Sequence, residues 1–235
     1  MITTILFDLD GTLLPMDQGL FVRSYVKRMA SYMAMHGYDR KEFTQAIIKS
    51  TGKMIHNDGS CTNEDVFWTH FCEVFGETVL KDKPLFEEFY RTEFQNVAED
   101  CGHTPEAGKL IQLLKAEGFR LVLATNPIFP AIATESRMRW AGVDPSDFEF
   151  YTTYENSSFC KPNLKYYQGV LDSIGCQAEE CVMVGNDIRD DMVAEALGIK
   201  GFLLTNWLIE RENTDISSYP NGGFDALRNY LLNLK

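Results

Sequence analysis

The feature that most constrains this chain is a run at residues 2–9 that is rich in Ile, Leu, Phe and Thr and ends in two acids and a glycine, Asp8, Asp10 and Gly11. Continuous Ile, Leu, Phe and Thr without polar alternation are typical of a strand buried on both faces of a parallel sheet. Such a strand needs helices on both sides, which predicts an α/β fold. Asp8 and Asp10 then lie at the carboxyl end of the strand, where open parallel sheets bind ligands.

Helical and strand patterns alternate through the second half of the chain. Helix patterns occupy residues 105–116, 163–174 and 190–197, and strand patterns occupy residues 120–125, 148–153, 181–185 and 200–204. This alternation predicts a doubly wound parallel sheet with right-handed crossovers. Residues 206–223 are typical of an irregular surface segment, and a closing helix follows them.

Residues 18–96 have a different pattern, with helix formers at apolar spacing and no strong strand signal. We interpret them as an all-helical insertion in which residues 51–62, rich in glycine and polar residues, form a loop. The predicted organisation is an α/β core domain at residues 1–16 and 97–235, with a smaller helical cap domain at residues 17–96.

Composition narrows the classes of partner. The formal net charge is −12, whereas nucleic acids and anionic membranes are bound through clustered Lys and Arg. We therefore expect no nucleic-acid and no membrane partner. An acidic protein that binds a phosphate must neutralise it locally, with a cation, a few basic residues and backbone amides.

The six cysteines include no CxxC pair and no histidine at metal-ligand spacing, so we interpret them as reduced thiols. No basic flank with a long apolar run opens the sequence, and no run is long enough for a membrane span. The expected location is cytoplasmic. The sequence leaves open whether the protein is a monomer or a homodimer.

The segment Asp8-Leu9-Asp10-Gly11-Thr12 carries the strongest chemical signal. Alternate residues of a strand point the same way, and the turn at Gly11 lets both carboxylates approach one site. A shared cation offsets their mutual repulsion. The simpler alternative is an ordinary turn, because Asp and Gly favour turns.

Two further strand-to-loop junctions carry candidates. Thr125-Asn126 follows the strand at residues 120–125, and its hydroxyl and amides suit a phosphate, although Thr-Asn-Pro is also a common loop opening. Lys161 precedes Pro162 in an otherwise uncharged loop, where it complements the acidic cluster. A solvated surface lysine is the simpler alternative.

The strand at residues 181–185 ends in a third group of polar side chains, with Asn186, Asp187, Asp190 and Asp191. Carboxylates at a strand end suit Mg²⁺, which prefers oxygen ligands. A cluster that caps the following helix explains one of these acids, but not all of them.

These four segments, in this order, resemble the motifs of the haloacid dehalogenase superfamily. The resemblance implies a Rossmann-like core with a helical cap and a phosphatase that uses Mg²⁺. It implies that Asp8 is the nucleophile, that Asp10 is the acid and base, and that Lys161 neutralises charge. It assigns phosphate binding to Gly11, Thr12, Thr125, Asn126 and Lys161, and metal binding to Asp8, Asp10, Asn186, Asp187 and Asp191.

One departure from the motifs leaves the metal ligands ambiguous. Asn186 occupies a place where many members carry Asp, so either Asn186 or Asp187 is the direct ligand, and we favour Asp187. The resemblance also implies phosphate-ester hydrolysis, because family members that cleave carbon–halogen or carbon–phosphorus bonds generally lack an acid at the position of Asp10.

The expected partner is a small phosphorylated metabolite, and Gln18, Arg23 and residues 49–56 are candidate cap contacts. The alternatives are a sugar phosphomutase and a catalytically inactive phospholigand-binding regulator.

Overall fold

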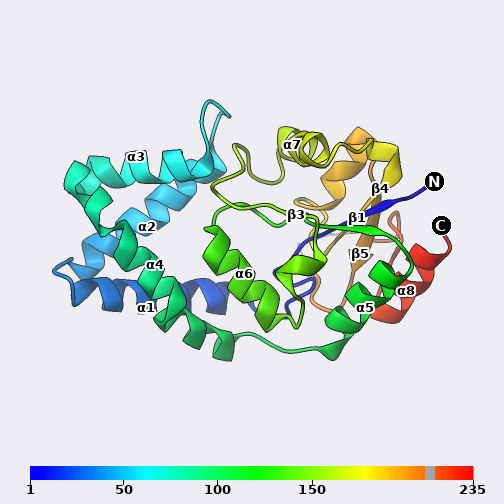
Figure 1. Ribbon diagram of the computed structural model, residues 1–235, viewed down its shortest axis with the longest axis horizontal. Helices are drawn as coiled ribbons and strands as arrows, with labels where there is room; N and C mark the ends of the chain where they lie inside the picture. Colours follow the sequence, from blue (N-terminus) through cyan, green and yellow to red (C-terminus); the bar gives the residue numbers. More distant parts are fainter. Residues whose placement is uncertain (210–214, 235) are drawn as a thin grey trace.

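The computed structural model describes residues 1–209 and 215–234, and its centre is a parallel six-stranded sheet (Figure 1). The strand order is β3-β2-β1-β4-β5-β6, and every neighbouring pair is parallel. The strands are β1 (Thr4–Phe7), β2 (Arg120–Leu123), β3 (Phe150–Tyr151), β4 (Cys181–Gly185), β5 (Lys200–Leu204) and β6 (Asn221–Gly222). The first strand is thus central, between β2 and β4.

Helices cover both faces of the sheet, which confirms the predicted α/β class. Ile5 and Phe7 of β1 belong to one apolar cluster with α5 (Pro105–Ala116) and α8 (Phe224–Leu232). Leu6 points the other way and packs in a second cluster with α7 (Leu164–Ile174). Three short 3₁₀ helices, η3 (Pro145–Asp147), η4 (Ala178–Glu180) and η5 (Met192–Leu197), and α6 (Ala131–Trp140) complete this part.

Beside the sheet lies a helical layer, at the left of Figure 1, formed by the inserted segment. Its elements are α1 (Gln18–Ala34), α2 (Arg40–Ile55), α3 (Asn63–Phe75), η1 (Glu77–Asp82), α4 (Lys83–Arg91) and η2 (Glu93–Asp100). Buried aromatic rings such as Phe43, Phe71 and Phe86 pack edge to face at its centre. The predicted boundaries at 16/17 and 96/97 stay a prediction.

The prediction of a loop over residues 51–62 is wrong in its first part. Helix α2 continues to Ile55, and only His56 to Thr62 leave helical geometry. Burial of Ile47, Ser50 and Met54 along one face stabilises this last turn. That packing outweighs the cost of a helical glycine at position 52, about 1 kcal/mol. The prediction of an irregular segment over residues 206–223 is wrong at its end, where Asn221–Gly222 form β6, and residues 210–214 lie outside the described residues.

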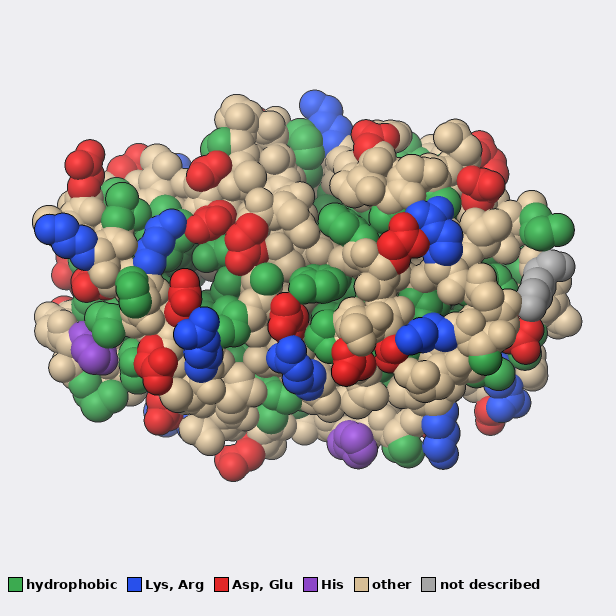
Figure 2. All heavy atoms as spheres, in the orientation of Figure 1, with side chains coloured by type: hydrophobic (Ala, Val, Ile, Leu, Met, Phe, Trp, Pro, Cys, Tyr) green, Lys and Arg blue, Asp and Glu red, His purple; other side chains and the backbone are tan. Residues whose placement is uncertain are grey.

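Charges are mixed on the face shown in Figure 2, where acidic and basic side chains alternate over both parts of the molecule. No described helix is long and apolar enough to cross a membrane. All six cysteines are free thiols. The absence of a nucleic-acid partner stays a prediction.

Asn63, at the start of α3, attaches the helical layer to the loops of the core. Its fully buried amide donates to the carbonyl of Pro127 at 3.0 Å and accepts from the Asn57 amide at 2.8 Å. Its backbone N–H donates to the carbonyl of Ser157 at 2.8 Å. Asn63 therefore links the two loops that carry Thr125-Asn126 and Lys161, one through its side chain and the other through its backbone.

We expect Asn63→Ala to lower the free energy of unfolding by about 1–3 kcal/mol, because it leaves buried polar groups without partners. Urea denaturation monitored by fluorescence measures the change. Asn96→Ala, which truncates an exposed asparagine of the same layer, serves as the control. Equal losses in the two variants contradict this role of Asn63.

Candidate active site

The turn after β1 places two predicted residues against the end of β4. The N–H of Asp8 donates to the carbonyl of Val184 at 2.9 Å, so strand pairing continues to the first acid. Thr12 is buried, and its hydroxyl donates to Asp8 Oδ2 at 3.2 Å. Gly11 has φ 85°, and a Cβ there lies only 2.2 Å from Asn186 Nδ2. Only glycine permits this close approach.

Lys161 lies buried between two carboxylates. Its ammonium donates to Asp8 Oδ1 at 2.9 Å and to Asp191 Oδ1 at 2.6 Å. Burial by itself lowers the pKa of Lys161, but Asp191 and Asp8 raise it well above the ordinary value. The side chain therefore stays cationic at the bottom of the site.

Asp191 uses its second oxygen to hold the loop after β4. Its Oδ2 accepts the backbone N–H groups of Asn186 and Asp187, both at 3.0 Å. A Cβ on Gly185 falls 2.1 Å from the same oxygen, so glycine is required there too. In this arrangement Asp191 orients the loop and Lys161, and its direct binding of a metal stays a prediction.

Asp10 lines the site, and its carboxylate pairs with a buried arginine through only one of its two oxygens. Oδ2 forms an ion pair with Arg137, whereas Oδ1 is buried and accepts no hydrogen bond from the described residues. Burial raises the pKa of Asp10, and the Arg137 guanidinium opposes the rise. Such a group can exchange a proton with a ligand.

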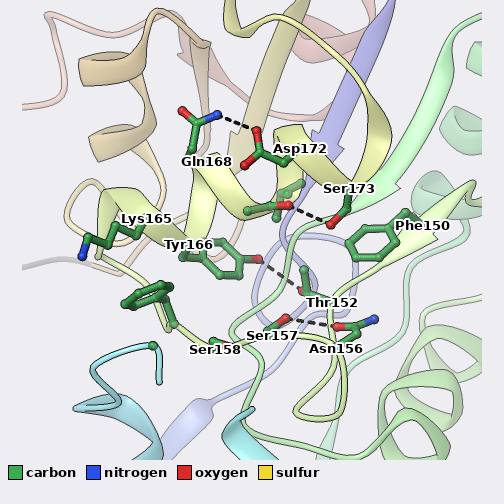
Figure 3. A pocket seen from close by; sticks show the side chains of 14 residues that line it. Phe150, Thr152, Asn156, Ser157, Ser158, Lys165, Tyr166, Gln168, Asp172 and Ser173 are labelled. Atoms are coloured by element: carbon green, nitrogen blue, oxygen red, sulfur yellow. Dashed lines mark hydrogen bonds between the residues drawn. The ribbon is translucent and has the colours of Figure 1, made fainter. Parts of the chain in front are cut away.

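Thr125 is fixed from behind by polar residues around β3 and α7. Its carbonyl accepts from the hydroxyls of Thr152 at 2.6 Å and Tyr166 at 2.8 Å. Figure 3 shows these two side chains meeting beside a polar pocket that Asn156 and Ser157 also line. The pocket lies outside the site, and its hydrogen bonds support the loop that carries Thr125.

These groups surround a cleft of about 230 Å³, here called the acidic cleft. It brings together all the predicted catalytic and metal-binding residues, with Thr125 and Asn126. Gly11 and Thr12 lie behind it. Of the cap candidates, Gln18 lines the cleft and donates weakly to the Asp10 carbonyl at 3.4 Å. Arg23 lines a separate groove between α1 and α2.

Comparison with known proteins identifies the family. A family model described as haloacid dehalogenase-like hydrolase matches residues 2–198. The chain belongs to this family. It is a hydrolase and a phosphatase-like member.

Two curated relatives and one solved structure illustrate the likeness. The chain is 27% identical to glyceraldehyde 3-phosphate phosphatase of Methanothermobacter thermautotrophicus, over 92% of this chain and 91% of that one. It is also 27% identical to pyrophosphatase PpaX of Bacillus pumilus, over 85% of this chain and 81% of that one. A 2-haloacid dehalogenase structure from Pseudomonas syringae aligns over the full length of both chains, with TM-score 0.64 and 18% identity, and shows the fold.

The oxygen donors of this haloacid dehalogenase-like hydrolase suit a hard cation. Asp8, Asp10, Asn186 and Asp187 line one cleft, and Oδ1 of Asp10 is buried without a hydrogen-bond partner among the described residues. The described residues contain no group of three Asp, Glu, His or Cys side chains close enough to hold a metal alone. Mg²⁺ commonly takes one or two carboxylates and completes its shell with phosphate and water, so the residues fit it.

Arg137 is the residue that the sequence analysis missed. It lies on α6 with 1% exposure, and its guanidinium stacks 4.4 Å from the Phe129 ring centroid. The sequence did contain a sign of this role. Arg137 is four residues from both Ala133 and Ala141, which places it on the buried face of the helix. A charge at a core position implies a buried partner, and here that partner is Asp10.

We expect Arg137→Met to lower the free energy of unfolding by about 3–5 kcal/mol, because it leaves the largely buried Asp10 carboxylate without its cation. Urea denaturation measures the change. Arg139→Met is the matched control, since Arg139 lies on the same helix with its side chain 59% exposed and should cost at most about 1 kcal/mol. Similar losses for both variants contradict a structural role for the Arg137–Asp10 pair.

Proposed function

We propose that this hydrolase is a Mg²⁺-dependent phosphatase that hydrolyses a small phosphorylated metabolite through an aspartyl-phosphate on Asp8. The observation that carries the proposal is the arrangement of three charged groups in the acidic cleft. Asp8 accepts a hydrogen bond from the Lys161 ammonium, and Asp10, whose Oδ1 is buried without a hydrogen-bond partner among the described residues, lines the same cleft. A nucleophile, a neutralising cation and a proton carrier thus share one small space.

In the first step, a carboxylate oxygen of Asp8 attacks phosphorus, and the bond from phosphorus to the ester oxygen breaks. Asp10 gives its proton to the departing alcohol, for which its raised pKa suits it. Lys161 stabilises the negative charge that builds up on the phosphoryl oxygens, aided by the amides around Thr125.

In the second step, Asp10 takes a proton from a water molecule whose oxygen attacks phosphorus. The bond from Asp8 to phosphorus breaks, inorganic phosphate leaves, and Asp8 returns to its carboxylate form. Asp10 gives up one proton in the first step and takes one up in the second, so the enzyme returns to its starting state.

A bound Mg²⁺ would offset the repulsion between Asp8 and the phosphate and hold the phosphoryl group in line. Asp8 and Asp187 would supply carboxylate ligands. Asn186 or Asp10 would supply a further oxygen. Asp191 contributes by fixing the Asn186 and Asp187 backbone. The Asn186 amide already donates to the Trp207 carbonyl at 2.7 Å and accepts from the Thr12 hydroxyl at 3.4 Å, which supports Asp187, rather than Asn186, as the direct ligand.

The named relatives support a small phosphorylated substrate, since one is a glyceraldehyde 3-phosphate phosphatase and another a pyrophosphatase. No feature of the described residues favours a phosphomutase. The cytoplasmic location and the monomeric or dimeric state stay predictions.

Asp8→Asn should lower hydrolysis of p-nitrophenyl phosphate by at least about 10³-fold, because the amide cannot form the phosphoenzyme. The wild-type protein should lose activity in EDTA and regain it with Mg²⁺. Release of p-nitrophenol measures both effects.

Asp225→Asn, which alters a largely exposed aspartate on α8, is the control and should leave the rate unchanged. Full activity in Asp8→Asn, or turnover that is indifferent to EDTA, overturns the proposal. Absence of turnover in the wild-type protein over a broad panel of esters supports the inactive regulator instead.

A further inference from the structure

A second cavity, here called the apolar chamber, opens between the helical layer and the core with a volume of about 290 Å³. Helices α1 to α4 and the loop after β2 form its walls, with side chains such as Tyr25, Ile47, Phe67, Trp68 and Phe86. None of the described residues that line it is charged. Its size is close to the lower end of small-molecule pockets.

The chamber adjoins the acidic cleft. Val22, Ile128 and Phe129 line both cavities, so these three residues lie where the two cavities meet. A molecule whose phosphate lies at Asp8 and whose body reaches past Phe129 would enter the chamber. Building on the proposed function, we propose that the apolar chamber binds the alcohol part of the substrate, and that the substrate is a phosphate monoester of an uncharged alcohol with a hydrocarbon body.

Charge supports this class of substrate. Lys161 is the only basic side chain among the described residues that line either cavity, and it already contacts two carboxylates. A second anionic group on the substrate would find no counterion in the chamber, where an unpaired charge is costly. The chamber therefore selects against carboxylates and second phosphates.

The exposure of apolar side chains also supports the binding of a hydrocarbon body in the chamber. Val22, Ile48 and Ile55 all line the chamber and remain 49%, 57% and 43% exposed, and Val22 and Ile48 also border the groove of Arg23. Large apolar side chains left in water around a concave surface mark ligand sites. The Tyr25 and Tyr90 hydroxyls bond to each other at 2.9 Å, which further reduces the polarity of the wall.

A series of n-alkyl phosphates tests the chamber without changing the chemistry, because their leaving alcohols have similar acidity. From ethyl to hexyl phosphate, kcat/KM should rise about fourfold for each methylene until the chamber is filled. An analogue with a terminal carboxylate in place of the last methyl group should lose this gain. A rate that is independent of chain length, or equal for the carboxylate analogue, overturns the inference.

Gly52 allows the chamber to be filled from within. It lines the chamber on α2 between Ile48 and Ile55, and a Cβ built on it meets no atom within 4 Å. Gly52→Phe should lower kcat/KM for hexyl phosphate by about tenfold or more and leave ethyl phosphate unaffected. Gly169→Phe is the matched control, because Gly169 is a helical glycine with equal space beside the polar pocket of Figure 3.

Binding of alkylphosphonates, measured by calorimetry, gives a readout that does not need turnover. Hexylphosphonate should bind wild-type protein more tightly than ethylphosphonate, and Gly52→Phe should remove the difference. Equal affinities contradict the chamber even when the protein hydrolyses phosphates. Chain-length-dependent binding without hydrolysis of any ester supports the chamber and contradicts the proposed phosphatase.

Discussion

The buried ammonium of Lys161 is the interaction on which the rest of the site depends. It holds Asp8 at the end of β1 and Asp191 after β4, and so joins three segments far apart in the sequence. Removing such a cation from a buried cluster leaves two carboxylates uncompensated, which is far more costly than losing a surface pair. The positive charge that stabilises the fold here is therefore also the one that can neutralise the negative charge of a phosphoryl group.

The parallel sheet makes this meeting possible, because β1 lies between β2 and β4 and all three end at the same edge. Each strand end delivers one part of the site. Two glycines then let the loops approach more closely than side chains permit, Gly11 against Asn186 and Gly185 against Asp191. Position in the sheet and absence of a Cβ together bring the charged groups within hydrogen-bonding distance.

Most residues of the acidic cleft could be predicted from the sequence, because each motif is a short segment at the end of a strand. The parallel topology of the sheet then brings these strand ends to the same edge. Asp8, Lys161 and Asp191 meet as the strand pattern implies. The extent of α2 could not be read in this way, since burial by neighbouring helices, rather than propensity, extends it through Gly52. Arg137, the partner of Asp10, was missed because tertiary packing also determines its position.

Arg137 lies 127 residues from Asp10 and belongs to no strand-end motif, so only packing brings the two together. Its helix shows no clear amphipathic pattern, because Arg137 and small residues share the buried face. The apolar chamber is harder still to predict, since it is a space left by four helices whose side chains individually resemble an ordinary core.

Phe129 connects the two halves of the site physically. One face of its ring supports the Arg137 guanidinium, which in turn holds Asp10, and the residue also lines both the acidic cleft and the apolar chamber. A hydrocarbon body in the chamber would pack against Phe129, which supports Arg137, the partner of the proposed proton carrier Asp10. Recognition of the alcohol and delivery of its proton are then linked through one aromatic ring, while the phosphoryl group is held at the charged end of the cleft.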